Sequence, residues 1–209
     1  MEVIPSINAE TFEEVEKKIK LVEPYVSWIH LDVADGTFAK TTTWHEPADL
    51  LSLKTPLNIE VHLMINNIEE RLDNWLIAPV KRIYFHIDTC KAPDFVIEKI
   101  KKAGIDPGIA IGPDESWTKA AHYKNKVDVF QILGVSPGPA GQKATEETFE
   151  RIKELRKFCD SCIIEVDGGM NKETAQKAAE AGADVIVVAS AIFGEKDVGK
   201  AIRELRKLT

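Results

Sequence analysis

The chain has 209 residues, of which 44% are hydrophobic and 29% charged, and its formal net charge is −7. This is the composition of an ordinary globular protein with a sizeable core, and the acidic balance argues against a broad nucleic-acid-binding surface. No apolar run is long enough to span a bilayer, and the first residues lack the basic region of a signal peptide. We therefore expect a cytoplasmic protein of one domain, residues 1–209, with no membrane or nucleic-acid partner.

Short apolar segments with strand spacing alternate with amphipathic segments along the whole chain. In the first half, strands are expected at residues 3–8, 28–33, 57–64 and 81–87, with helices at 11–22, 46–53, 68–78 and 92–103. In the second half, strands are expected at 107–111, 127–133, 162–166 and 184–188, with helices at 115–123, 146–158, 171–181 and 196–207. Asn171 is a good N-terminal cap, and Gly104 and Gly182 are placed to end helices.

Strand–helix units of about 26 residues, repeated eight times, have the length of a (β/α)8 barrel with few insertions. An open, doubly wound sheet would also alternate strands with helices. The number of units and the lack of any G-x-G-x-x-G turn favour the closed barrel. We therefore predict a single α/β domain folded as a TIM barrel.

The segment from Trp28 to Gly36 is apolar enough for a buried strand, yet it carries one His and two Asp. Side chains alternate between the two faces of a strand, so His30, Asp32 and Ala34 are expected together on the inner face. An imidazole and a carboxylate two residues apart offer two ligands to one cation. The alternative at this point is a His–Asp pair hydrogen-bonded inside the barrel without a metal.

Barrel enzymes bind their substrates at the C-terminal ends of the strands, where several polar side chains are expected here. These are Ser6, His30, Asp32, His62, His86, Asp167 and Ser190. Four of them can meet on one metal ion, namely His30, Asp32, His62 and Asp167. Two imidazoles and two carboxylates suit Zn, Fe(II), Mn or Co, and the spacing does not choose among these metals.

Turns rich in small residues follow the last three strands. They contain Gly138-Pro139-Ala140-Gly141, then Asp167-Gly168-Gly169, and finally Ala189-Ser190. Barrels often bind phosphate at this place, because glycine lets backbone N–H groups approach an anion and a following helix adds a favourable dipole. Any loop after a strand can contain glycine, but two adjacent turns of this kind favour a phosphate site.

The three cysteines, Cys90, Cys159 and Cys162, are too few for a disulfide framework. Cys159 and Cys162 have the spacing of a redox motif or of half a zinc site. However, no second pair is present, and this pair precedes a strand instead of opening a helix. We therefore expect these cysteines to be incidental.

Taken together, these motifs resemble the ribulose-phosphate 3-epimerase family almost from end to end. The matching segments are Pro5 to Ile7, Trp28 to Gly36, Val61 to Ile65, Pro137 to Gln142, Val166 to Gly169, and Ala189 to Phe193. The resemblance implies that a divalent metal is bound by His30, Asp32, His62 and Asp167. It also implies that the substrate and its phosphate lie against Ser6, His62, Gly138, Pro139, Ala140, Gly141, Gly168, Gly169, Ala189 and Ser190.

An enzyme of this kind serves the pentose phosphate pathway and inverts C3 of a ketose phosphate, converting D-ribulose 5-phosphate to D-xylulose 5-phosphate. A proton next to the ketone leaves from one face and returns to the other, so one carboxylate on each side serves in turn as base and acid. Asp32 and Asp167 are the expected catalytic pair, and the metal stabilises the enediolate. Whether the chain forms a homo-oligomer is left open.

Several positions depart from the family's usual sequence. Two methionines of the family are replaced by Ala34 and Leu133, only Met64 remains, and the phosphate loop carries Pro139 and Ala140 instead of Phe and Gly. We expect extra room beside the metal at Ala34 and slower closure of the stiffened loop. The expected result is a lower rate on ribulose 5-phosphate with broader substrate tolerance.

Two other functions stay open on the sequence. One is a sister epimerase acting on another ketose phosphate, such as allulose 6-phosphate. The other is a non-catalytic barrel that binds a phosphorylated sugar, although the complete set of ligand types argues against it. The related barrels hexulose-phosphate synthase and orotidylate decarboxylase would carry an Asp-x-Lys-x-x-Asp run, and the segment Asp32-Val33-Ala34-Asp35 lacks the lysine.

Overall fold

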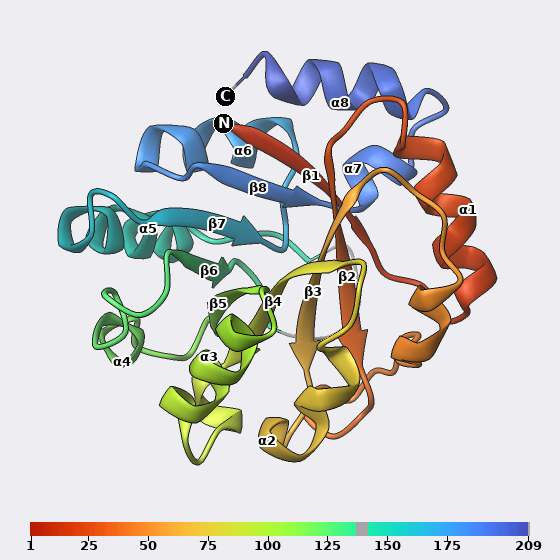
Figure 1. Ribbon diagram of the computed structural model, residues 1–209. Coiled ribbons are helices and arrows are strands. Elements are labelled where there is room, and N and C mark those ends of the chain that lie inside the picture. Colours follow the sequence, from red (N-terminus) through yellow and green to blue (C-terminus); the bar gives the residue numbers. More distant parts are fainter. Residues whose placement is uncertain (137–141, 209) are drawn as a thin grey trace.

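The computed structural model describes residues 1–136 and 142–208. Within them, parallel strands pair in chain order, and the last strand pairs with the first, which closes a barrel (Figure 1). The strands are β1 (Glu2–Ile7), β2 (Trp28–Ala34), β3 (Asn58–Met64), β4 (Val80–His86), β5 (Asp106–Ile111), β6 (Val129–Leu133), β7 (Ile163–Asp167) and β8 (Val185–Val188). The predicted (β/α)8 barrel is confirmed.

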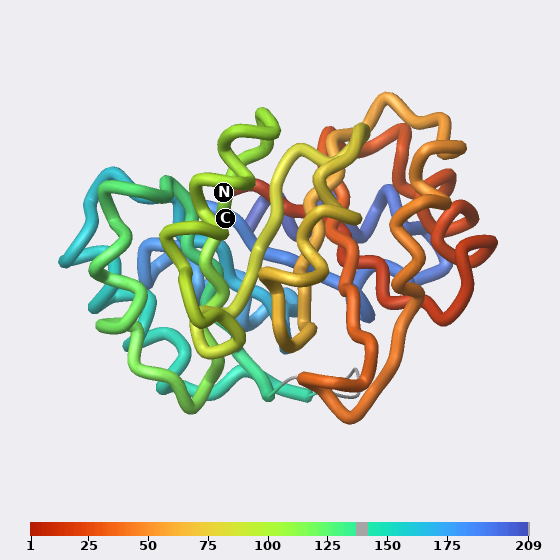
Figure 2. Tube along the Cα trace, turned by 60° about the horizontal axis from the view of Figure 1, so that its bottom comes forward, coloured from red at the N-terminus to blue at the C-terminus, as the bar shows by residue number. Residues whose placement is uncertain are grey.

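Helices surround the barrel on the outside. The α-helices are α1 (Phe12–Val22), α2 (Ile68–Arg71), α3 (Pro93–Lys102), α4 (Thr118–Ala121), α5 (Glu146–Phe158), α6 (Lys172–Ala181), α7 (Ser190–Phe193) and α8 (Val198–Arg206), with 3₁₀ helices η1 (Pro47–Leu51), η2 (Leu72–Trp75) and η3 (Ile87–Thr89). In both views the red-to-orange and the green-to-cyan parts of the chain lie on opposite sides (Figures 1 and 2). Strands β2 and β3 therefore face β6 and β7 across the barrel. Among the described residues, no helix combines the length and the apolar character needed to cross a membrane.

Three predicted helix boundaries are confirmed by the backbone. The Asn171 side chain accepts hydrogen bonds from the N–H groups of Glu173 and Thr174 and so begins α6. Gly182 ends that helix with a φ of 104°, and Gly104 follows α3 with a φ of 74°. Glycine takes up this left-handed conformation readily because it has no Cβ.

Three predicted helices are shorter than expected, and two short ones, α7 and η3, were not expected. The segment 46–53 holds only η1, the segment 68–78 divides into α2 and η2, and the segment 115–123 keeps only α4. Residues 112–115 form a turn before this helix, where the Glu115 carboxylate accepts the N–H of Gly112 at 3.0 Å. In the segment 68–78, Asp73 and Asn74 are weak helix formers, and Pro79 follows.

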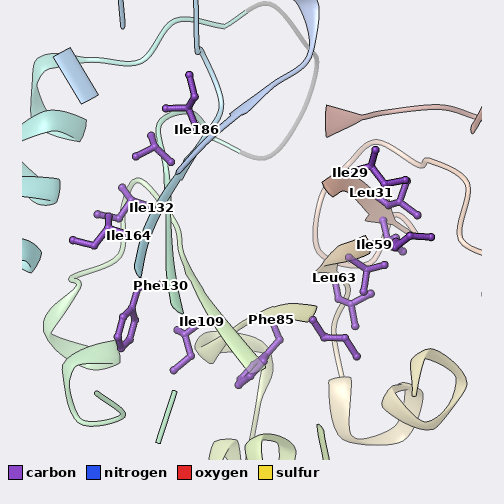
Figure 3. Close-up of a cluster of buried hydrophobic side chains, with 14 of the residues drawn as sticks. Ile29, Leu31, Ile59, Leu63, Phe85, Ile109, Phe130, Ile132, Ile164 and Ile186 are labelled. Atoms are coloured by element: carbon purple, nitrogen blue, oxygen red, sulfur yellow. The ribbon is translucent and has the colours of Figure 1, made fainter. Parts of the chain in front are cut away.

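The main hydrophobic core lies between the strands and the surrounding helices. Outward-facing residues of β2 and β3, such as Ile29, Leu31 and Ile59, are buried in it (Figure 3). Strand β3 also contributes Leu63, and strands β4 to β8 contribute Phe85, Ile109, Phe130, Ile132, Ile164 and Ile186. Because side chains alternate along a strand, His30 and Asp32 point into the barrel. The predicted division of the second strand into an apolar outer face and a polar inner face is confirmed.

At the end of the barrel where the strands begin, Arg156 of α5 joins several turns. Its guanidinium donates to the carbonyls of Cys159, Asp160, Cys162 and Gly182 and pairs with the carboxylate of Asp184. Cys159 and Cys162, which we expected to be incidental, are joined by a disulfide. The turn after α5 brings their Cα atoms to 5.5 Å, a separation that a disulfide can bridge.

Candidate active site

Four side chains at the C-terminal ends of the strands converge inside the barrel. His30 and Asp32 come from β2, and His62 comes from β3. Asp167, at the end of β7, reaches them from the opposite side, and one ligand atom of each residue lies within 4.8 Å of the others. His62 Nδ1 is 3.4 Å from Asp32 Oδ1 and 3.6 Å from Asp167 Oδ2. His30 Nε2 is 3.5 Å from Asp32 Oδ1 and 4.0 Å from Asp167 Oδ2. The structure thus brings the predicted ligands together.

These separations fit a divalent transition metal. Ligands held about 2.0–2.2 Å from a tetrahedral ion lie about 3.3–3.6 Å from one another. Three of the distances between imidazole nitrogens and carboxylate oxygens are 3.4, 3.5 and 3.6 Å. His62 Nδ1 is buried and has no hydrogen-bond partner in the described part of the chain, a state that is costly unless a bound group satisfies the nitrogen. The donor set is one that Zn²⁺, Fe²⁺, Mn²⁺ or Co²⁺ accepts.

The electrostatics of the cluster also favour a cation. Burial lowers the pKa of His30, but hydrogen bonds and charges from Asp32 and Glu60 outweigh burial and raise that pKa well above its ordinary value. Burial likewise lowers the pKa of His62, and its contacts with Asp167 and Asp32 raise it overall. Burial raises the pKa of Asp32, yet the two neighbouring histidines bring it well below its usual range. The carboxylates therefore hold positive charge at this point, as protons or as a metal ion.

Two further residues hold the cluster from its edges. The Ser6 hydroxyl donates to Asp32 Oδ2 at 2.6 Å. His86 Nε2 is 3.0 Å from His62 Nε2, and Phe38 stacks on the His86 ring at 4.5 Å. Burial, together with the charge on His62, lowers the pKa of His86 well below its ordinary value, so its imidazole is neutral. A neutral His86 accepts the hydrogen of His62 Nε2 and leaves His62 Nδ1 directed at the two carboxylates.

A second layer of buried polar side chains lies deeper in the barrel, below the four ligands. Glu60 and Arg82 form an ion pair there, and Glu165 accepts a hydrogen bond from Gln131 at 3.0 Å. Burial and the charge of Glu60 raise the pKa of Glu165 well above its ordinary value. We did not predict these residues from the sequence. The signal was present, because Glu60 and Glu165 each stand two positions before a predicted ligand and therefore share its inward face.

A cavity of about 220 Å³ lies beside the cluster. The predicted site residues in its wall are Ser6, Asp32, His62, Asp167, Gly168, Gly169, Ala189 and Ser190. Gly138, Pro139, Ala140 and Gly141, also predicted to bind substrate, lie outside the described residues. Polar residues that we did not predict also line the cavity, namely Asn8, Ser136, Gln142, Lys143 and Asn171. Of these, Asn8 could have been found, because it lies two residues after Ser6 on an alternating strand.

The turn after β7 requires glycine at two consecutive positions. Gly168 and Gly169 have φ values of 94° and 73°, in the left-handed region that other residues rarely adopt. A Cβ on Gly169 would lie 2.2 Å from the backbone nitrogen of Ala144. The glycines therefore let the turn pack closely against the chain that follows β6 while it forms part of the cavity wall.

The space beside Ala34 is filled, and our expectation of extra room there is wrong. Ala34 is 1% exposed and packs with Ala39, Met64 and Phe38. The chain after β2 folds back over the strand, where Thr43 N–H donates to the Ala34 carbonyl at 2.8 Å. The cavity wall includes Met64 but not Ala34. The loop after β2 thus supplies the side chains that occupy this space.

Known proteins of one family are similar to this chain over nearly its whole length. The model of the Ribulose-phosphate 3 epimerase family matches residues 2–193. Ribulose-phosphate 3-epimerase of Bacillus subtilis (strain 168) is 33% identical over 214 residues, covering 99% of this chain and 98% of its own. The cytoplasmic isoform of ribulose-phosphate 3-epimerase of Oryza sativa subsp. japonica is 32% identical over 211 residues, covering 98% of this chain and 92% of its own.

Solved structures of lower identity share the fold alone. The 3-hexulose-6-phosphate synthase of Salmonella typhimurium superposes with a TM-score of 0.74 at 15% identity and covers 100% of this chain and 98% of its own. Orotidine 5'-phosphate decarboxylase of Pyrococcus horikoshii OT3 gives a TM-score of 0.69 at 16% identity, covering 99% and 98%. Both support a barrel that closes over the full length of the chain.

Proposed function

Because this chain belongs to the ribulose-phosphate 3-epimerase family, we propose that it is a metal-dependent epimerase that inverts C3 of D-ribulose 5-phosphate to give D-xylulose 5-phosphate. The observation that carries the proposal is the meeting of Asp32 and Asp167, from opposite sides of the barrel, next to two histidines. Epimerisation needs an acid and a base on opposite faces of one carbon. Carboxylates that come from β2 and β7 suit that requirement.

In this mechanism Asp32 removes the C3 proton from one face of the substrate and Asp167 returns a proton to the other face. The roles exchange when the reaction runs backwards. The neighbouring histidines lower the pKa of Asp32 and so favour its ionised form, the form that can accept a proton. The Ser6 hydroxyl, 2.6 Å from Asp32 Oδ2, holds that carboxylate in one orientation and leaves Oδ1 directed at the cluster.

His30, Asp32, His62 and Asp167 would hold the metal, which would supply positive charge to stabilise the negative charge that develops on the substrate. Gly168, Gly169, Ala189 and Ser190 line the same cavity, and we assign them to the phosphate group. Backbone N–H groups in glycine turns and at the start of a helix suit an anion. The phosphate would then anchor the sugar with C3 between the two carboxylates.

The test is the exchange of the C3 proton in D₂O, followed by NMR for ribulose 5-phosphate and for allulose 6-phosphate. We expect deuterium at C3 together with formation of the C3 epimer, faster on the five-carbon sugar. The Asp32→Asn, Asp167→Asn double variant, which lacks both bases, is the control for contaminating epimerase. Faster turnover of allulose 6-phosphate would assign a sister epimerase instead, and binding of both sugars without exchange would leave a phosphosugar-binding barrel.

A further inference from the structure

A row of three buried side chains begins at His30 of the candidate metal site and continues across two neighbouring strands. His30 on β2 is the register partner of Glu60 on β3, and Glu60 is the register partner of Arg82 on β4. His30 and Glu60 are fully buried, and Arg82 is 8% exposed. Neighbouring strands lie about 4.8 Å apart, so residues at one register level on one face are in reach of each other. The contacts within this row are therefore set by the strand register of the barrel.

Glu60 connects the other two residues. Its Oε1 atom is 2.8 Å from His30 Nδ1, and its Oε2 atom accepts a hydrogen bond from Arg82 Nη1 at 2.9 Å. The Arg82 guanidinium lies over the Trp28 ring, 4.7 Å from its centroid. With both oxygens engaged, the Glu60 carboxylate has one orientation. An ionised carboxylate only accepts hydrogen bonds, so the hydrogen of the first contact belongs to His30 Nδ1.

We propose that Glu60, held by Arg82, is a positioning residue that keeps hydrogen on His30 Nδ1 and thereby leaves Nε2 as the nitrogen that binds the metal. This inference rests on the metal-dependent function proposed above. Nε2 is the nitrogen on the side of the cluster, 3.5 Å from Asp32 Oδ1. A carboxylate partner fixes the ring and makes the imidazole a stronger ligand, and losing such a partner weakens metal binding about 10–100-fold.

A second cation held by His30, Glu60 and Glu165 is the competing explanation for the same groups. These three residues do lie close enough to share an ion. However, Arg82 already supplies positive charge to Glu60. The 2.8 Å contact between Glu60 Oε1 and His30 Nδ1 is also shorter than two ligands of one ion approach, about 3 Å or more. The geometry is that of a hydrogen bond.

Glu165 provides a matched control in the same layer. Its side chain is fully buried, like that of Glu60. Its Oε1 atom is 3.7 Å from His30 Nδ1, beyond hydrogen-bond distance, and accepts from Gln131 instead. Glu165→Gln therefore changes a buried carboxyl group in the same surroundings while both partners of Glu60, His30 and Arg82, are kept.

The experiment measures Zn²⁺ affinity by competition with a chromophoric chelator, alongside the free energy of unfolding in urea. We expect the Kd for Zn²⁺ to rise at least tenfold in Glu60→Gln and to change less than about threefold in Glu165→Gln. Unchanged affinity in Glu60→Gln, or equal losses in both variants, would overturn the proposal. Wild-type protein that binds none of Zn²⁺, Mn²⁺ and Co²⁺ would instead overturn the metal dependence, and this inference with it.

A double variant covers the case in which Glu60→Gln does not fold because Arg82 is left as an unpaired buried charge. Glu60→Leu with Arg82→Met replaces the ion pair by apolar side chains of similar size, a change that is often neutral or stabilising. We expect this protein to fold and to bind Zn²⁺ at least tenfold more weakly than wild type. If Glu60 only stabilised the fold, a double variant that folds like wild type would also bind Zn²⁺ like wild type. Wild-type Zn²⁺ affinity in the double variant would therefore overturn the proposal.

Discussion

The two ends of the barrel bury polar groups in opposite ways. Where the strands finish, His30 and His62 stand 3.4–4.0 Å from the carboxylates of Asp32 and Asp167. Most of these separations are too long for hydrogen bonds. Where the strands begin, Arg156 donates hydrogen bonds of 2.8–3.3 Å to four backbone carbonyls. The four side chains where the strands finish therefore leave part of their hydrogen-bonding capacity unused. Where the strands begin, Arg156 and the backbone carbonyls satisfy one another.

The difference separates groups placed for a ligand from groups placed for the fold. Buried polar atoms normally find partners within the protein, so a set that faces a shared point without completing its bonds is suited to a bound group. In barrels of this kind the C-terminal ends of the strands carry the chemistry, and the other end contributes stability. Substitutions at the first end should therefore reduce turnover, and those at the second should reduce the free energy of unfolding.

The largest effect is expected for Asp32→Asn and Asp167→Asn. Each removes one proton-transfer group and one charged metal ligand, and we expect turnover to fall by at least about 10²–10⁴-fold. Both variants should keep the fold, because the hydrophobic core between the strands and the helices is untouched. Coupled spectrophotometric assays measure turnover, and urea unfolding checks the fold. Turnover within tenfold of wild type in either variant would contradict the assignment.

Removal of the metal should have a comparable effect on activity. We expect a strong chelator to abolish epimerisation and added Zn²⁺, Mn²⁺, Fe²⁺ or Co²⁺ to restore it, because two imidazoles and two carboxylates suit these ions. Elemental analysis of the protein before and after chelation provides the control. Full activity in protein shown to be free of metal would refute this prediction.

A smaller loss is expected for Ser6→Ala at the same end. Its hydroxyl donates to Asp32 Oδ2 at 2.6 Å, and a hydrogen bond to a charged group contributes about 1.5–3 kcal/mol. If that bond orients the catalytic carboxylate, kcat should fall about 10–100-fold while the fold is kept. Ser190→Ala, in the same cavity but assigned to the phosphate, should raise KM more than it lowers kcat. If instead Ser6→Ala mainly raised KM and Ser190→Ala mainly lowered kcat, Ser6 would be assigned to the phosphate and Ser190 to catalysis.

The smallest effect on turnover is expected for Arg156→Ala at the opposite end. We expect a loss of about 2–3 kcal/mol in the free energy of unfolding, because several carbonyls lose their donor together. Turnover per folded molecule should stay within about twofold of wild type, since this end of the barrel carries no chemistry. Lys153→Ala on the same helix is a control, because its exposed ion pair with Glu150 should contribute little. A large loss of kcat in Arg156→Ala would contradict the view that only the C-terminal ends of the strands carry the chemistry.

Much of this site could be predicted from the sequence, because the faces on which its side chains lie follow from the alternation along single strands. His30 and Asp32 share one strand face by simple alternation, and the closing topology brings Asp167 across to meet them. Glu60 and Arg82 were not predicted, because their pairing depends on the register of β3 against β4, which alternation alone does not give.

The wrong expectations arise where non-local packing decides. Phe38 and Ala39, which pack against Ala34, come from a loop that folds back over β2. The sequence of the strand alone therefore could not show that the space beside Ala34 is filled. The helix predicted at 115–123 keeps only α4, and the Glu115 carbonyl accepts a hydrogen bond from Arg151 of α5 instead of one from the next helical turn. The pairing of Cys159 with Cys162 depends on the turn geometry after α5.

The central claim is that Asp32 and Asp167 act on opposite faces of one carbon. It is tested most directly by NMR in D₂O, with Asp32→Asn and Asp167→Asn each incubated separately with ribulose 5-phosphate and with xylulose 5-phosphate. With one base left, each variant should exchange the C3 proton of one sugar only, a different sugar for each variant, and should interconvert neither. Exchange of both sugars by the same variant, or continued interconversion in either, would contradict the two-carboxylate mechanism.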